Sequence, residues 1–152
     1  TLFRSFPEVQ HVNGVRVTAV YNPANPTEAD AFADTYSIPV STVEPEEFLN
    51  SVDAVYVASP HLTHYSYVKW LLENGKHVLC ETPLTLVSTE AVSLIELARE
   101  RHLTLMEANK TAHFPAFNHL ISLIKSGLIG TIVDIDASLS TLRQEGKTYC
   151  SA

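Results

Sequence analysis

The chain has 152 residues, of which 45% are hydrophobic and 18% charged, and its formal net charge is −7. This composition excludes a disordered tail and a low-complexity repeat, and it suits one packed domain. The negative charge repels phosphate backbones and anionic lipid, so neither nucleic acid nor a membrane surface is an expected partner. No apolar run approaches the roughly 20 residues of a transmembrane helix. Two cysteines far apart in the sequence, Cys80 and Cys150, favour reduced thiols and a cytoplasmic location.

The first two thirds of the sequence alternate between predicted strands and predicted helices. Residues 15–21 are an apolar, β-branched run typical of a buried strand, and Asn25-Pro26 then supplies the cap and first turn of a helix. Alternation of this kind predicts a parallel sheet with helices on both faces, joined by right-handed crossovers. The remaining strands are expected near Val40 and over residues 52–58, 78–80 and 103–106, with helices over about 45–50, 65–72 and 88–98.

The last forty residues have a different pattern. Apolar positions predict a helix over residues 114–124, which ends at Ser126-Gly127. Between Ile132 and Leu142 apolar and polar residues then alternate, as in a strand with one solvated face. This pattern is typical of an antiparallel sheet, so we expect this strand to open a second domain.

Polar or turn-forming residues follow each of the predicted buried strands. In open parallel sheets, ligands bind at the carboxyl ends of the strands. Four such segments together predict a crevice for a nucleotide or another small molecule, although strand-to-helix turns explain any single segment equally well. The segments are Asn22, Ser59-Pro60-His61, Glu81-Thr82-Pro83 and residues 107–110.

Three side chains near these strand ends invite a chemical interpretation. His61 and His64 are spaced like metal ligands, but no third histidine or cysteine lies at a suitable spacing, so no metal site is expected. Glu81 is a candidate acid or hydrogen-bond acceptor, with a salt bridge at a turn as the equally favoured alternative. Cys80 lies within an apolar strand, which favours a small buried hydrophobic residue over a nucleophile.

Two motifs in this region resemble one family of enzymes. SPHLTH at residues 59–64 and GKHVLCETP at residues 75–83 are similar to the Gfo/Idh/MocA family of NAD(P)-dependent oxidoreductases, whose pattern is a proline turn with a following histidine and then GKHVxxEKP. Residues 106–108, 114–115 and 126–130 also look like segments of that family. The resemblance implies an incomplete Rossmann-like parallel sheet over residues 1–112. Residues 113–152 would then form the start of a C-terminal α/β domain, including its first strand. That domain would make the substrate and oligomer contacts.

The resemblance also implies a cofactor, a reaction and site residues. The cofactor would be NAD or NADP. Hydride would pass to or from a hydroxyl or carbonyl carbon of a sugar, polyol or similar small molecule. A homo-oligomer is also possible for a protein of this family. Asn22 would lie near the adenosine ribose. Glu81 and Pro83 would lie under the nicotinamide side, and the proline turn allows a cis peptide bond at low cost. Four residues would border the cofactor: Ser59, Pro60, His61 and His64.

Departures from the family pattern are equally informative. The lysine of the EKP motif, which helps to hold the nicotinamide ribose and substrate, is Thr82 here, and threonine cannot stabilise a developing alkoxide as an ammonium does. Where some relatives have an arginine, this chain has Ala112. Nearby Lys110 is a candidate to supply the missing positive charge, although a solvated lysine in a turn is the favoured interpretation. The alternative is therefore a non-catalytic nucleotide-binding or regulatory protein of the same fold.

Two expected elements of a complete enzyme do not occur in these residues. A glycine-rich pyrophosphate loop should precede Val15, and the family's proton-transfer aspartate and histidine should follow Ala152. We therefore interpret the chain as an internal fragment of an oxidoreductase, and we expect the isolated fragment to be inactive.

Overall fold

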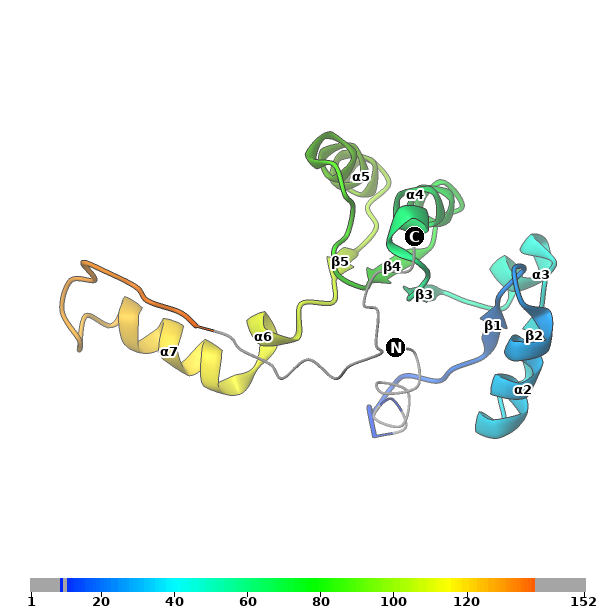
Figure 1. Ribbon diagram of the computed structural model, residues 1–152, viewed down its shortest axis with the longest axis horizontal. Coiled ribbons are helices and arrows are strands. Elements are labelled where there is room, and N and C mark those ends of the chain that lie inside the picture. Colours follow the sequence, from blue (N-terminus) through cyan, green and yellow to red (C-terminus); the bar gives the residue numbers. More distant parts are fainter. Residues whose placement is uncertain (1–8, 10, 139–152) are drawn as a thin grey trace, which may run out of the picture. The chain divides into compact units, whose positions relative to one another are not determined.

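The computed structural model describes residue 9 and residues 11–138, and it contains short parallel strands joined by helices (Figure 1). The chain divides into two compact units, Thr1–Ala108 and Asn109–Ala152. A functional domain boundary after residue 112 stays a prediction. In chain order the elements are β1 (Ala19–Tyr21), α2 (Pro26–Tyr36), β2 (Val40–Thr42), α3 (Pro45–Asn50), β3 (Ala54–Val57), the 3-10 helix η1 (His61–Thr63), α4 (His64–Glu73), β4 (His77–Cys80), α5 (Ser88–Glu100), β5 (Leu105–Glu107), α6 (Lys110–His113) and α7 (Pro115–Lys125).

Local sequence signals place the first helix as predicted. The Asn25 side chain accepts a hydrogen bond from the backbone N–H of Glu28 at 3.2 Å, and Pro26 occupies the first turn of α2. The helix ends at Ser37, whose left-handed φ of 54° turns its N–H back to the Ala33 and Asp34 carbonyls. Strand β1 is shorter than the apolar run over residues 15–21 that predicted it, because only Ala19–Tyr21 pairs with β2.

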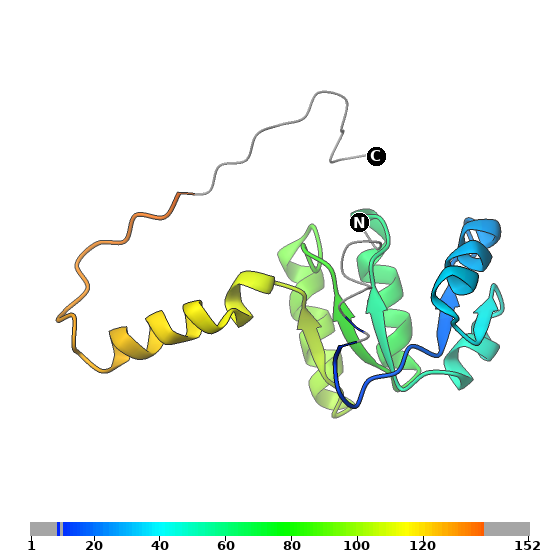
Figure 2. The same cartoon turned by 90° about the horizontal axis from the view of Figure 1, so that it is seen from below.

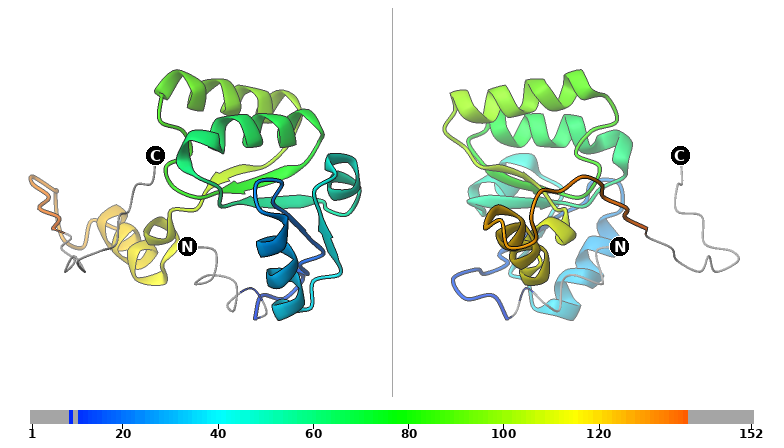
Figure 3. Two further views of the ribbon diagram at one scale, coloured as in Figure 1. Left: turned by 45° about the vertical axis from the view of Figure 1, so that its right-hand side comes forward. Right: turned by 90° about the vertical axis from the view of Figure 1, so that its left-hand side faces the viewer.

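The strands form two parallel sheets, one of β1 and β2 and one in the order β3-β4-β5. The predicted α/β architecture with parallel strands is confirmed. Helices α4 and α5 lie side by side on one face of β3-β4-β5 (Figures 1 and 3). Their apolar sides and the strands form the core, with the fully buried or nearly buried side chains Val57, Val68, Leu71, Leu72, Val78, Cys80, Leu94 and Ala98.

The two sheets share this core through aromatic side chains. The Tyr21 ring at the end of β1 stacks on Phe48 of α3 at a centroid distance of 5.1 Å and lies 5.7 Å from Trp70 of α4. The Thr18 hydroxyl donates to the Ser51 carbonyl at 2.7 Å, which ties the segment before β1 to the end of α3. These contacts hold β1 and β3 in one compact unit although the two strands belong to different sheets.

Within residues 11–108, no helix covers the opposite face of β3-β4-β5 (Figure 2). Tyr56, Leu79 and Met106 are aligned across the three strands on this face and are 38–43% exposed. The strand order explains the asymmetry, since two successive right-handed crossovers in the same direction place both connecting helices on the same side.

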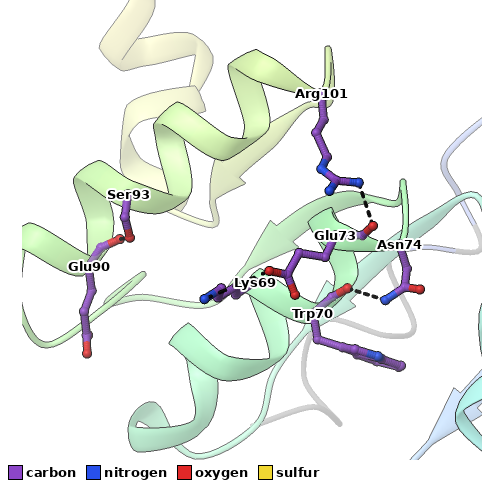
Figure 4. Close-up of polar contacts among 7 residues, drawn as sticks. All are labelled: Lys69, Trp70, Glu73, Asn74, Glu90, Ser93 and Arg101. Carbon is purple, nitrogen blue, oxygen red and sulfur yellow. Dashed lines mark hydrogen bonds and ion pairs between the residues drawn. The ribbon is translucent and has the colours of Figure 1, made fainter.

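Polar side chains close the carboxyl ends of α4 and α5 (Figure 4). Arg101, directly after α5, donates from Nη1 to the carbonyl of Glu73 at 2.7 Å. Asn74 donates from Nδ2 to the Trp70 carbonyl at 2.8 Å. Glu73 is the last residue of α4, so its carbonyl has no N–H partner within the helix and is satisfied by Arg101 instead. The Trp70 carbonyl accepts from the backbone N–H of Asn74 as well, at 3.1 Å.

In the second unit, α6 and α7 are followed by extended chain rather than a strand. Residues 131–138 form no strand, so the strand predicted to begin at Ile132 is not formed up to residue 138. Residues 139–142 of that prediction lie outside the described residues. An alternating pattern makes a strand only where another strand satisfies its backbone N–H and C=O groups, and here Val133 is 93% exposed.

Across residues 9 and 11–138, no helix combines the length and apolar character needed to cross a membrane.

Candidate functional site

The carboxyl ends of three parallel strands meet at one edge of the larger sheet. Val57, Cys80 and Glu107 are aligned in register, so the segments that follow β3, β4 and β5 leave the sheet at the same level. Backbone hydrogen bonds extend this alignment, from Glu81 N–H to the Val57 carbonyl at 2.9 Å and from Ala108 N–H to the Cys80 carbonyl at 2.7 Å. The turn after β3 and the turn after β4 are therefore neighbours.

The turn after β3 presents Ser59, Pro60 and His61. The hydroxyls of Ser59 and Thr63 lie 2.8 Å apart, and the Thr63 hydroxyl also lies 2.7 Å from the Pro60 carbonyl. This arrangement ties the turn to the first residues of the following helix. Pro60 and His61 are exposed, and Ser59 is half-buried, so this turn offers polar and apolar surface to a ligand at the strand ends.

His64, the first residue of α4, connects the two turns. Its ring is completely buried, with Nδ1 2.8 Å from the Pro83 carbonyl oxygen and Nε2 2.9 Å from the Ser59 carbonyl oxygen. Protein atoms enclose the whole ring, so His64 has no exposed surface, unlike its neighbour His61. The sequence-based expectation placed both histidines beside the cofactor, and for both it stays a prediction.

The turn after β4 contains Glu81, Thr82 and Pro83. The Glu81 carboxylate accepts a hydrogen bond from the Tyr56 hydroxyl of β3, so its partner is a phenol rather than the salt-bridge partner considered from the sequence. Thr82 is exposed. The Thr82–Pro83 peptide bond is cis, whereas the sequence suggested a cis bond at the proline turn after β3.

Glu107 is the residue of this region that sequence reasoning did not single out. Its carboxylate Oε1 accepts a hydrogen bond from the backbone N–H of Leu84 at 3.0 Å, across 23 residues of sequence. The signals available beforehand were its place after a predicted strand and within residues 106–108, a segment that resembles the family, and neither distinguished its side chain from other polar residues.

Two other predicted site residues belong to other elements of the chain. Asn22 follows β1, at the end of the smaller sheet, and its Oδ1 accepts a hydrogen bond from the backbone N–H of Asn25 at 3.2 Å. Lys110 begins α6 in the second compact unit. Their proposed roles, near the adenosine ribose and as a substitute cation, stay predictions.

Within residues 9 and 11–138, no three or more histidine, cysteine, aspartate or glutamate side chains are grouped so that they could hold a metal ion. A shallow hollow of about 300 Å³ lies beside the amino ends of β3 and β4, lined by Glu46, Leu49, Asn50, Asn74 and Lys76. That hollow lies at the opposite end of the strands from the two turns. Because ligands of parallel α/β sheets bind at the carboxyl ends of the strands, the two turns are the candidate binding site.

Cys80 ends β4 directly before the second turn and is completely buried. Burial, together with the carboxylates of Glu107 and Glu81, raises the pKa of the Cys80 thiol to about 12. At neutral pH the group is therefore a protonated thiol and a poor nucleophile. The sequence-based interpretation of Cys80 as a buried small hydrophobic residue agrees with this environment.

We expect Cys80 to resist alkylation in the folded protein. In a Cys150→Ser variant, which leaves Cys80 as the one cysteine, iodoacetamide at pH 8 should label the folded chain at least about 100 times more slowly than the urea-unfolded chain. Because the folded state holds this proton more tightly than the unfolded state, the contribution of Cys80 to stability should be constant below about pH 9 and fall as the pH rises toward 12. Equal labelling rates in the two states would contradict this prediction.

Parallel strands joined by helices, with turn segments gathered at the carboxyl ends of adjacent strands, define a Rossmann-like α/β domain. Comparison with known proteins agrees with this class. Residues 4–109 match the family described as "Oxidoreductase family, NAD-binding Rossmann fold", and the chain belongs to that family, Gfo/Idh/MocA.

Relatives with assigned activities support the same family. The chain is 36% identical over 146 residues to the D-xylose 1-dehydrogenase (NADP(+)) of Hypocrea jecorina, a match that covers 88% of this chain and 36% of the relative. It is 40% identical over 91 residues to the dTDP-3,4-didehydro-2,6-dideoxy-alpha-D-glucose 3-reductase of Actinomadura kijaniata, covering 60% of this chain and 27% of the relative. The chain spans about a third of the length of the curated relatives it matches.

A solved structure shows the same fold. The 3-ketoreductase KijD10 from Actinomadura kijaniata, determined with NADP and TDP-benzene, superposes with a TM-score of 0.71 at 31% identity. The superposition covers 82% of this chain and 38% of KijD10.

Proposed function

We propose that the complete protein containing these residues is an NAD(P)-dependent oxidoreductase acting on a sugar, a polyol or a similar small hydroxyl or carbonyl compound. The observation that carries the proposal is the alignment of the turn after β3 with the turn after β4, inside the segment that matches an NAD-binding oxidoreductase family. The activities of two relatives, a xylose dehydrogenase and a nucleotide-sugar reductase, support a sugar-like substrate.

The residues at these strand ends fit part of a dinucleotide. Exposed Pro60 and His61 supply a surface against which a flat ring or ribose can lie, and exposed Thr82 supplies a hydroxyl at the same edge. The fit does not extend to the pyrophosphate, because the five glycines of the chain, at 14, 75, 127, 130 and 146, make no Gly-x-Gly-x-x-Gly loop. When bound, the cofactor accepts or supplies a hydride and so carries the redox chemistry.

The chain's own residues would then orient the cofactor rather than move protons. Thr82 is uncharged, so it can donate a hydrogen bond to a hydroxyl but cannot offset the negative charge of an alkoxide. Glu81 already accepts from Tyr56, which holds its carboxylate beside the sheet. The exposed threonine at this position is the specific observation that favours a second candidate function, a nucleotide-binding protein without turnover.

Binding and turnover measured on the same complete protein separate the two functions. We expect NADPH or NADH to bind saturably in a fluorescence titration, and we expect oxidation or reduction of at least one member of a panel of aldoses, ketoses and polyols. Binding with no turnover across the panel supports the second function. No binding of either nucleotide contradicts both.

A matched pair of histidine substitutions tests the place of binding. His61→Asn removes an exposed ring at the carboxyl end of β3 and should weaken nucleotide binding by about three- to tenfold. His102→Asn alters another exposed histidine, the second residue after α5, where a left-handed φ of 56° suits asparagine. Nucleotide affinity should be unchanged in this control. Equal effects of the two substitutions would contradict the proposed place of binding.

A further inference from the structure

The turn after β4 is held from two sides by side chains that are distant in the sequence. On one side, His64 Nδ1 is 2.8 Å from the carbonyl oxygen of Pro83. On the other, Glu107 Oε1 accepts a hydrogen bond from the N–H of Leu84 at 3.0 Å. The carbonyl and the N–H of one peptide unit, between Pro83 and Leu84, are therefore each engaged by a different side chain. These two bonds fix the orientation of that peptide plane and so the direction in which the turn leaves the sheet.

The contacts of His64 also link this turn to its neighbour. The second ring nitrogen, Nε2, lies 2.9 Å from the carbonyl oxygen of Ser59 in the turn after β3. Carbonyl oxygens only accept, so a neutral imidazole donates to one of the two carbonyls, according to its tautomer, and a doubly protonated ring donates to both. A completely buried ring between two carbonyls sets the spacing of the two turns, because either turn can move only by losing one of these contacts.

Thr82 precedes Pro83 and is exposed, while Glu81 on one side is bonded to Tyr56 of β3 and Pro83 on the other is in contact with His64 of α4. Its side chain is thus presented at the strand ends by a backbone that other residues position. Neither His64 nor Glu107 needs to touch a ligand to influence what Thr82 and Pro60 present to one.

We propose that His64 and Glu107 are positioning residues that together fix the Thr82–Pro83 turn against the turn after β3, so that the two turns form one rigid nucleotide-contacting edge. The effect on the nucleotide rests on the proposed function, whereas the holding of the turn does not.

Two amide substitutions of His64 separate positioning from simple filling of space. Asparagine places an N–H donor near the position of Nδ1, and glutamine places one near the position of Nε2. His64→Asn should therefore keep the bond to Pro83 and change the dissociation constant for NADPH by less than about threefold. His64→Gln should lose that bond and weaken binding by about tenfold. Both variants lose ring packing, so both should unfold at a lower temperature, and binding is measured well below either midpoint.

The two substitutions of Glu107 test the other side of the turn. Glu107→Ala removes the acceptor of the Leu84 N–H, and we expect amide hydrogen exchange at Leu84 to become at least about tenfold faster. Glu107→Gln keeps an acceptor oxygen on a side chain of the same length. The rate of amide hydrogen exchange at Leu84 should therefore stay near that of the parent protein. Glu96→Ala, at an exposed position of α5, is the control and should leave exchange at Leu84 unchanged.

The outcomes distinguish this proposal from the proposed function. Faster exchange at Leu84 in Glu107→Ala together with no nucleotide binding by the parent protein would uphold the held turn and overturn the function. Unchanged exchange at Leu84 in Glu107→Ala would overturn the positioning role of Glu107. Equal nucleotide affinity of His64→Asn and His64→Gln, in a parent protein that binds, would overturn the positioning role of His64 and leave it a packing residue.

Discussion

Replacing Thr82 with lysine in the complete protein that contains this chain is expected to raise the turnover number for sugar oxidation or reduction by about 10²- to 10³-fold. The reaction develops negative charge on the substrate oxygen, and a positioned cation or donor at that oxygen contributes a rate factor of this size. Thr82 is exposed at the carboxyl end of β4, so a lysine can be accommodated there without burying its charge. The measurement is steady-state kinetics with NADP(H) and the best substrate of the panel.

The control for this substitution is Thr82→Met, which adds a side chain of similar length without the charge. We expect turnover in Thr82→Met to stay at or below that of the parent protein, while the affinity for NADPH changes little in either variant. An equal gain in the lysine and methionine variants would show that length rather than charge matters. No gain in the lysine variant would favour a nucleotide-binding protein without turnover.

Replacing Leu72 with alanine is expected to destabilise the chain by about 2–5 kcal/mol. Leu72 lies on α4, has no exposed surface and belongs to the core cluster between α4, α5 and the sheet. Its truncation removes apolar contacts and leaves a cavity that close-packed neighbours fill only partly. Urea denaturation followed by far-ultraviolet circular dichroism measures the loss.

Leu62→Ala is the matched control for this stability prediction. Leu62 precedes the same helix within η1 but is 73% exposed, so its truncation should change the free energy of unfolding by no more than about 0.5 kcal/mol. Similar losses in the two variants would contradict the position of the core between α4 and the sheet.

Elements whose signals are local were predictable from the sequence. The cap at Asn25 and the proline after it set the start of α2, because the groups that they satisfy lie within one turn of the chain. The parallel arrangement followed from strands separated by helices, since that connection allows few other topologies. The position of the candidate site followed in turn, because ligand-binding turns of such sheets lie at the carboxyl ends.

Features that depend on distant partners were not predictable in the same way. The alternation after Ile132 is a property of the sequence, but no strand forms up to residue 138, because a strand requires a neighbouring backbone. The exposed face of Tyr56, Leu79 and Met106 likewise depends on which helices lie beside the sheet rather than on the strands themselves.

His64 and Glu107 show the same limit at the site. From the sequence, His61 and His64 are two equivalent histidines beside a proline turn, and Glu107 is one polar residue among several. Burial and a contact with Pro83, 19 residues away, distinguish His64 from His61. A hydrogen bond from Leu84, 23 residues away, distinguishes Glu107.

The sequence by itself predicted a parallel α/β domain, its resemblance to one family, and the strand ends that we propose for a nucleotide. Periodicity, caps and motifs carry this information because they act between residues close in the chain. Only the tertiary structure decided which of the predicted side chains face outward at that edge and which hold it in place. Burial and hydrogen-bond partners across 19 to 23 residues arise when the strands align, and no local pattern specifies them.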